Sequence, residues 1–140
     1  MLFRSVDCGL AVFGEVGSKD MKNDAGLLVL QAHDCFEAGA ELVLVEAAEL
    51  IANGKPKMKL IDGLRRGLDM SRVLIELPGP WISNITLSVV EDMKKFLVRE
   101  FGPDVNVANV MPADIMETEA LRVGLGVVGP QVSRDSNSKS

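Results

Sequence analysis

The sequence predicts an α/β fold in which strands and helices alternate, and three observations support this prediction. Short apolar runs end close to the polar residues Glu15, Glu46, Glu76 and Asn109, which follow one another at intervals of 31, 30 and 33 residues. Each run is followed by a stretch with helical spacing of its apolar residues. A repeat of about 30 residues with one strand and one helix is typical of a parallel sheet.

The number of units limits the architecture. Four units do not close an eight-stranded barrel, so the sheet is either a small open α/β layer, such as a flavodoxin-like module, or the second half of a (β/α)8 barrel. A helical remnant at Met1 with no strand before it favours the half-barrel. We therefore expect four βα units over residues 1–125, with two open sheet edges, and a disordered tail over residues 126–140, which are small and polar.

The first two units are expected as follows. The apolar run over residues 10–16 predicts the first strand. Asn23 or Asp24 is suited to cap a helix over residues 25–38, because short polar side chains accept a hydrogen bond from the first helical turn. The continuous apolar run before Glu46 predicts a second strand that is buried on both faces.

The last two units have similar signals. Ser83 or Asn84 is suited to cap the long helix that ends at Phe101, and Pro112 is suited to open the last helix. The remaining elements are expected at residues 47–52 (a short helix), 60–67 (a helix), 73–76 (the third strand), 105–110 (the fourth strand) and 113–123 (the last helix).

Composition excludes several classes of partner. The net charge of −5 disfavours nucleic acid, and aromatic residues make up only 4% of the chain, which leaves no stacking platform for single strands. No apolar run approaches the length of a membrane helix, and the N-terminus lacks the pattern of a secretory signal. We expect a cytoplasmic protein with Cys8 and Cys35 as reduced core residues, and one histidine, His33, cannot complete a zinc site with them.

The polar residues at the strand ends form the candidate site. Right-handed crossovers bring the carboxyl ends of parallel strands to one edge, where ligands bind in barrels and open sheets alike. Glu15, Glu46, Glu76 and Asn109 should therefore converge. Carboxylate oxygens suit Mg2+, which also takes water and substrate oxygens. The alternative is that each carboxylate only ends its strand and pairs with a nearby cation.

Lysines near this edge add two further candidates. Lys19 lies four residues after Glu15 and is suited to donate a proton or stabilise negative charge, unless it is a solvated loop residue. Lys55, Lys57 and Lys59 form a basic cluster after the second strand. This cluster either gathers an anionic substrate or forms a solvated face.

Four segments together resemble the phosphosulfolactate synthase family. They keep the family's order and spacing across residues 9–125, and the related plant heat-stress-associated proteins share the same framework. The segments are Glu15-Val16-Gly17-Ser18-Lys19-Asp20, Glu37-Ala38-Gly39-Ala40 running into Val43-Leu44-Val45-Glu46, Val105-Asn106-Val107-Ala108-Asn109-Val110, and Glu119-Ala120-Leu121-Arg122 with Gly124-Leu125.

The resemblance implies a (β/α)8 barrel of roughly 250 residues, in which this chain corresponds to strands five to eight. Family members add sulfite to phosphoenolpyruvate in a Mg2+-dependent reaction that gives (2R)-phospho-3-sulfolactate on the route to coenzyme M. Lys19 falls on the family's proposed acid. The roles implied for the other residues are catalysis for Glu15, metal binding for Glu46 and Glu76, and substrate binding for Glu46, Asn106, Asn109 and Lys55.

The sequence also departs from the family pattern at two basic positions. Ala48 and Gly126 stand where the family usually has arginines that are suited to hold phosphate or sulfite. Lys55 or Lys57 is a candidate substitute. The resemblance therefore leaves two expectations open: a lyase that binds small anions and forms a homo-oligomer, or a truncated, non-catalytic relative that acts through self-association.

Overall fold

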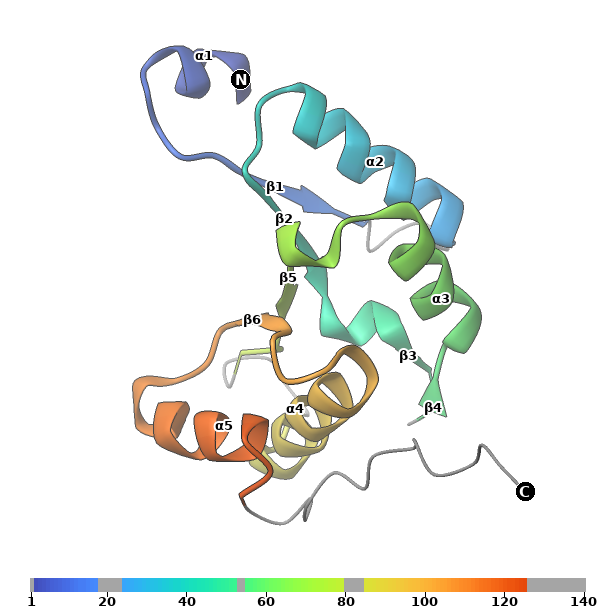
Figure 1. Cartoon of the computed structure of the whole chain (residues 1–140), viewed down its shortest axis with the longest axis vertical. Helices are drawn as coiled ribbons and strands as arrows, with labels where there is room; N and C mark the ends of the chain where they lie inside the picture. The colour runs from blue at the N-terminus through green and yellow to red at the C-terminus, as the bar shows by residue number, and fades with distance from the viewer. Residues whose placement is uncertain (1, 18–23, 53–54, 80–84, 126–140) are drawn as a thin grey trace, which may run out of the picture.

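Four parallel strands form the central sheet of the computed structural model, which describes residues 2–17, 24–52, 55–79 and 85–125. The strands are β1 (Phe13–Val16), β2 (Leu42–Glu46), β5 (Val73–Glu76) and β6 (Asn106–Ala108). They lie side by side in the order of the sequence, β1-β2-β5-β6 (Figure 1). A flavodoxin-like sheet reverses its strand order at a switch point. The uninterrupted order confirms the predicted half of a (β/α)8 barrel.

Helices connect these strands in the alternating pattern that the repeat predicts. Short 3-10 segments (η) and one small antiparallel pair, β3 with β4, complete the fold. The elements are α1 (Leu2–Asp7), α2 (Ala25–Glu37), η1 (Ala47–Leu50), β3 (Ile51–Ala52), β4 (Lys55–Pro56), α3 (Met58–Gly67), η2 (Met70–Arg72), α4 (Leu87–Phe101), η3 (Pro112–Asp114) and α5 (Ile115–Arg122). None of the described helices is both long and apolar enough to cross a membrane.

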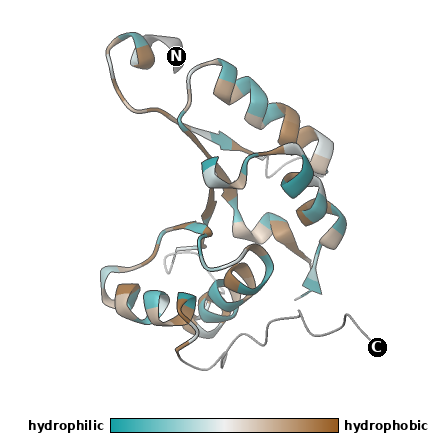
Figure 2. Cartoon of the chain, viewed as in Figure 1, coloured by the Kyte–Doolittle hydropathy of each residue, from teal (hydrophilic) through white to brown (hydrophobic). Residues whose placement is uncertain are grey.

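The two faces of the sheet differ in burial. Side chains that alternate along the strands, such as Val45 and Ile75, are about 1% exposed or less and pack against Leu28, Leu64 and Leu97 from the helices. Figure 2 shows this central region as hydrophobic. We call the opposite side of the sheet the inner face, because it corresponds to the interior of a barrel; it carries Phe13, Glu15, Leu42, Leu44, Glu46, Leu74, Glu76, Asn106 and Ala108. These side chains are half-buried or exposed.

Side chains fix the helices to the sheet at defined points. Asp24 caps α2 by accepting a hydrogen bond from the Leu27 N–H at 2.9 Å, as predicted. Arg72 donates to the Ala40 carbonyl at 2.8 Å and lies over the ring of Phe36. Arg122 donates to the Val105 carbonyl at 2.7 Å and so attaches α5 to the start of β6. These contacts hold the helices on the outer face and leave the inner face free of them.

Several predicted boundaries are wrong, and each has a local cause. β1 begins at Phe13 rather than residue 10, because its neighbour β2 begins only at Leu42. β6 ends at Ala108 because Asn109 takes a positive φ of 61°, which turns the chain out of the strand. The predicted helix over residues 47–52 divides into η1 and β3 because that segment pairs with β4 instead.

Two further expectations need correction. Thr86 caps α4 by accepting from the Val89 N–H at 3.3 Å, whereas the predicted caps, Ser83 and Asn84, lie outside the described residues, as do Asn23 and the tail over residues 126–140. Cys8 is exposed, so it is not a core residue. Cys35 is partly buried against the core, and this burial, with the nearby Asp34 charge, raises the pKa of its thiol.

Candidate functional site

A cavity of about 520 Å³ lies at the carboxyl ends of the parallel strands, where the site is predicted. Four predicted residues line it, namely Glu15, Glu46, Glu76 and Asn109. Right-handed βα connections place these ends at one edge of the sheet. The predicted convergence of strand-end side chains is therefore confirmed for the described part of the chain.

Strand register sets how the three carboxylates relate to one another. Glu46 and Glu76 are direct partners on the neighbouring strands β2 and β5, so their side chains leave the same face at the same level. Neighbouring strands are about 4.8 Å apart. Glu15 pairs with Leu44, two residues before Glu46, and therefore lies one level deeper on the inner face. It is the penultimate residue of β1, not the last.

Asn109 positions one of these carboxylates. Its Nδ2 donates to Glu76 Oε1 at 2.8 Å and to the Leu77 carbonyl oxygen at 3.1 Å. Asparagine tolerates the left-handed conformation found here better than most residues do. The positive φ thus turns the amide back toward Glu76, and the amide holds that carboxylate in the cavity wall.

The donor set fits a magnesium ion held by two carboxylates rather than three. Among the residues that the structure describes, no three His, Cys, Asp or Glu side chains are placed to share one metal ion. Mg2+ commonly binds through one or two carboxylates and completes its octahedron with water and substrate oxygens. Glu46 and Glu76 satisfy that requirement, while Glu15 is separated from Glu76 by a strand.

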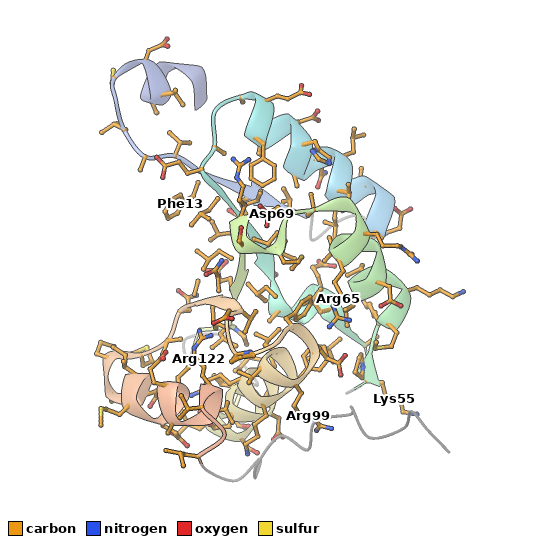
Figure 3. All side chains as sticks on the ribbon, viewed as in Figure 1. Phe13, Lys55, Arg65, Asp69, Arg99 and Arg122 are labelled. Carbon is orange, nitrogen blue, oxygen red and sulfur yellow. The ribbon has the colours of Figure 1, made fainter. Side chains whose placement is uncertain are left out.

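The other predicted site residues lie elsewhere or outside the described ranges. The Asn106 amide donates to the Ser71 and Val73 carbonyls at 2.8 and 3.2 Å, so it joins β6 to the start of β5. Lys55 is exposed on β4, at the edge of the molecule in Figure 3, and does not line the cavity. Lys19 lies outside the described residues.

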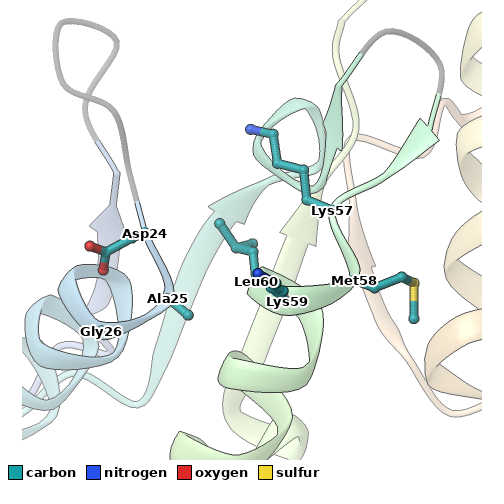
Figure 4. A pocket seen from close by; sticks show the side chains of 7 residues that line it. All are labelled: Asp24, Ala25, Gly26, Lys57, Met58, Lys59 and Leu60. Carbon is teal, nitrogen blue, oxygen red and sulfur yellow. The ribbon is translucent and has the colours of Figure 1, made fainter.

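A second cavity, of about 570 Å³, is lined by residues at the start of α2 and of α3 (Figure 4). Asp24 lies on one side of it, and Lys57 and Lys59 lie on the other. Two lysines of the predicted basic cluster, Lys57 and Lys59, therefore line a different cavity from the three carboxylates, and Lys55 lines neither cavity.

The carboxylate cavity also has walls that the sequence interpretation missed. Leu77, Pro78 and Gly79 follow β5 directly, and their position after a strand is the signal that was available to find them. Ala48 also lines the cavity, and it stands where the family that the sequence resembles usually has an arginine. No described lining residue carries a positive charge. The cavity wall is thus acidic on the strands and apolar around them.

Comparison with known proteins agrees with this geometry. Residues 3–127 match the family model described as (2R)-phospho-3-sulfolactate synthase (ComA). The phosphosulfolactate synthase of Methanothermobacter thermautotrophicus is 30% identical over 132 residues, which cover 86% of this chain and 47% of the relative. The phosphosulfolactate synthase of Bacillus subtilis is 29% identical over 126 residues, which cover 81% of this chain and 45% of the relative.

A third relative, the phosphosulfolactate synthase of Methanocaldococcus jannaschii, is 28% identical over 134 residues, covering 87% of this chain and 49% of the relative. The chain therefore spans about half the length of the curated relatives it matches. Its four strands correspondingly make half of an eight-stranded barrel. With the family model matching most of its length, the chain belongs to the phosphosulfolactate synthase family.

Proposed function

We propose that this chain forms the half of a phosphosulfolactate synthase that binds Mg2+, in an enzyme that adds sulfite to phosphoenolpyruvate and yields (2R)-phospho-3-sulfolactate. The observation that carries the proposal is the in-register pair of Glu46 and Glu76 in a cavity at the carboxyl edge of the sheet. Membership of the phosphosulfolactate synthase family supports this choice of reaction. The relatives are about twice as long, so the complete site requires a second half-barrel.

The reaction requires one new bond and one proton. A lone pair on the sulfite sulfur forms a bond to the methylene carbon of phosphoenolpyruvate, and the π electrons of the double bond move toward the carbon that bears the phosphate. Bound Mg2+ would act as a Lewis acid on the substrate carboxylate. A proton must then reach the phosphate-bearing carbon. We assign its donation to Lys19, which lies four residues after Glu15 in the sequence.

Asn109 and Glu15 also contribute to the proposed site. Asn109 holds Glu76 by a 2.8 Å hydrogen bond, which fixes the orientation of a metal-binding carboxylate. Glu15 reaches the same cavity from the strand that leads to Lys19, and we place it in the catalytic group with that lysine. Both substrates are anions, and the described walls are acidic, so cations must balance the charge. Mg2+ and Lys19 would supply that balance.

Two variants test this assignment. Glu76→Gln should weaken Mg2+ binding measured by calorimetry and lower the formation of phosphosulfolactate from phosphoenolpyruvate and sulfite. Glu49→Gln is the matched control, because Glu49 lies on η1 and does not line the cavity. Lys19→Ala should lower turnover by about 10²- to 10⁴-fold, the usual contribution of a general acid, while Mg2+ binding is retained. Equal Mg2+ affinity in wild type and Glu76→Gln would reject the metal site.

A non-catalytic relative that acts through self-association is the second candidate. The observation that favours it is Ala48 in the cavity wall, since a family arginine there would bind phosphate or sulfite. In that case the wild-type protein binds Mg2+ but forms no product at any substrate concentration. Product formation by the wild-type protein would exclude this candidate.

A further inference from the structure

Lys94 is a buried charged residue that the proposed reaction does not use. Its side chain is 2% exposed, although it lies in the middle of α4 and ends in an ammonium group. Removing such a group from water is costly unless partners compensate for the lost hydration. Within the residues that the structure describes, Lys94 Nζ makes no hydrogen bond, so the ammonium group depends on the charges near it.

Two carboxylates supply these charges, and they come from different elements. Lys94 Nζ forms an ion pair with Glu91, which lies three residues earlier on α4. The same Nζ lies 4.0 Å from Asp114 Oδ2, at the junction of η3 and α5. Glu91 and Asp114 are 27% and 34% exposed, so water solvates both of them. The contact with Asp114 joins α4 to the start of α5, and Figure 1 shows these two helices side by side.

The direction of the Lys94 side chain brings this contact toward the level of the carboxylate cavity. Long side chains on a helix point toward its amino-terminal end, and Glu91 lies on that side of Lys94. Because α4 follows β5 in a βα unit, its first turn lies nearer the carboxyl edge of the sheet than its last turn does. The contact with Asp114 is therefore made toward the end of α4 that is nearer the cavity.

The segment of residues 109–114 connects this ion pair to the cavity. Its first residue, Asn109, donates a hydrogen bond to Glu76 Oε1 at 2.8 Å. Residues 111–113 are exposed, so they contribute little that could hold the segment in place. Its last residue, Asp114, makes the ion pair with α4. The segment is thus attached to the body of the protein at both of its ends.

Hydrogen bonds around Asp114 make the far end of this segment rigid, so a contact there can act over several residues. The Asp114 N–H donates to the Met111 carbonyl at 2.8 Å. The hydroxyl of the buried Thr118 donates to the Asp114 carbonyl, also at 2.8 Å. Asn109 has a positive φ of 61°, and a backbone conformation of that kind persists only where the surrounding structure holds it. A fixed far end limits the conformations that the turn at Asn109 can adopt.

We propose that Lys94 is a positioning residue that holds Asn109, and through it the Glu76 carboxylate, in the cavity wall. The inference rests on the proposed function, because it treats Glu76 as a metal-binding carboxylate. A buried ion pair adds little net stability compared with apolar residues of similar volume, and it is better suited to select one arrangement of the chain. Methionine in place of Lys94 would therefore fill the same space at about the same stability, but it would not hold Asp114.

Hydrogen exchange of the Asn109 side-chain amide, measured by NMR on the full chain, tests this proposal without metal or substrate. Lys94→Met and Asp114→Asn should each raise the exchange rate by about tenfold, the factor that one hydrogen bond to a charged group typically contributes. The two substitutions act on one contact, so the double variant should exchange no faster than either single variant. The Tm of Lys94→Met should stay close to that of wild type, since the two remaining carboxylates are solvated.

Glu91→Gln is the matched control for these variants. It removes a carboxylate charge from the same ammonium group, but it acts within α4 and leaves the contact with Asp114 in place. The Asn109 exchange rate in this variant should equal that of wild type.

Calorimetry then relates this position to the metal site. Lys94→Met should weaken Mg2+ binding in the wild-type background and should not weaken it further in an Asn109→Ala background, because the effect passes through Asn109. Unchanged Asn109 exchange in both Lys94→Met and Asp114→Asn would overturn the proposal, and so would equally faster exchange in Glu91→Gln. A wild type that binds no Mg2+ would reject the proposed metal site instead, and the exchange rates would still decide the role of Lys94.

Discussion

The contact between α2 and α3 gives a sharp test of the packing that shapes the carboxyl edge of the sheet. Gly63 of α3 faces Ala25 at the start of α2, and a Cβ built on Gly63 would lie 2.3 Å from the Ala25 Cβ. Ordinary contacts between carbon atoms are about 3.5–4.0 Å. Gly63→Ala therefore requires the two helices to separate by more than 1 Å, as the difference between these distances shows.

Two opposing effects determine how much Gly63→Ala changes the free energy of unfolding. Alanine favours a helix over glycine by about 1 kcal/mol, whereas overpacking of a close contact costs about 1–3 kcal/mol. Both atoms in this clash are attached directly to helical backbone, so side-chain rotation cannot relieve it, and we take the upper end of the range. The net effect is a destabilisation of about 2 kcal/mol, which lowers Tm by about 8 °C for a chain of this size.

Thermal unfolding followed by circular dichroism at a fixed protein concentration measures this effect. The exchanged pair Ala25→Gly with Gly63→Ala moves the methyl group from one helix to the other, and it should recover most of the lost stability. Gly26→Ala is the control, since among the described residues its new methyl would meet only an Asp24 carboxylate oxygen at 3.3 Å. A Gly63→Ala variant as stable as wild type, or an exchanged pair no more stable than that single variant, would refute the argument.

Two further predictions concern the cavity and the pH dependence of stability. Ala48→Arg should lower KM for phosphoenolpyruvate by about tenfold, because the new arginine adds a charge-assisted contact for an anion. The control variant Ala48→Met adds no charge and should leave KM unchanged. Equal KM values in the two variants would count against the proposed anion site. The Ser71 hydroxyl and backbone N–H donate to the Asp69 carboxylate at 2.7 and 3.0 Å and hold its pKa below the usual value. A lowered pKa in the folded state stabilises the protein above the unfolded pKa near 3.9 and ceases to do so as pH falls through the folded value. Asp69→Ala should therefore lower Tm at pH 7, and the difference in Tm between wild type and this variant should become smaller below about pH 4. A difference in Tm that stays constant down to pH 2.5 would contradict this linkage.

The sequence alone was enough to predict the fold class and the location of the site. Strand–helix repetition at about 30 residues requires right-handed parallel units, and this places Glu46, Glu76 and Asn109 at one edge whatever the details of packing. The cap at Asp24 was predictable for a similar reason, because it depends on residues within one turn. These features follow from local spacing and from the handedness of the chain.

Tertiary structure decided the roles of the individual side chains. Asn106 and Asn109 are only three residues apart, yet Asn106 bonds to Ser71 and Val73, whereas a positive φ turns Asn109 toward Glu76. Likewise, Lys55 and Ala48 both follow β2, and only Ala48 lines the carboxylate cavity. Such outcomes depend on register and on a single backbone rotation, which are set by contacts between residues about 30 positions apart. Periodicity within a short stretch of sequence contains no information about these contacts.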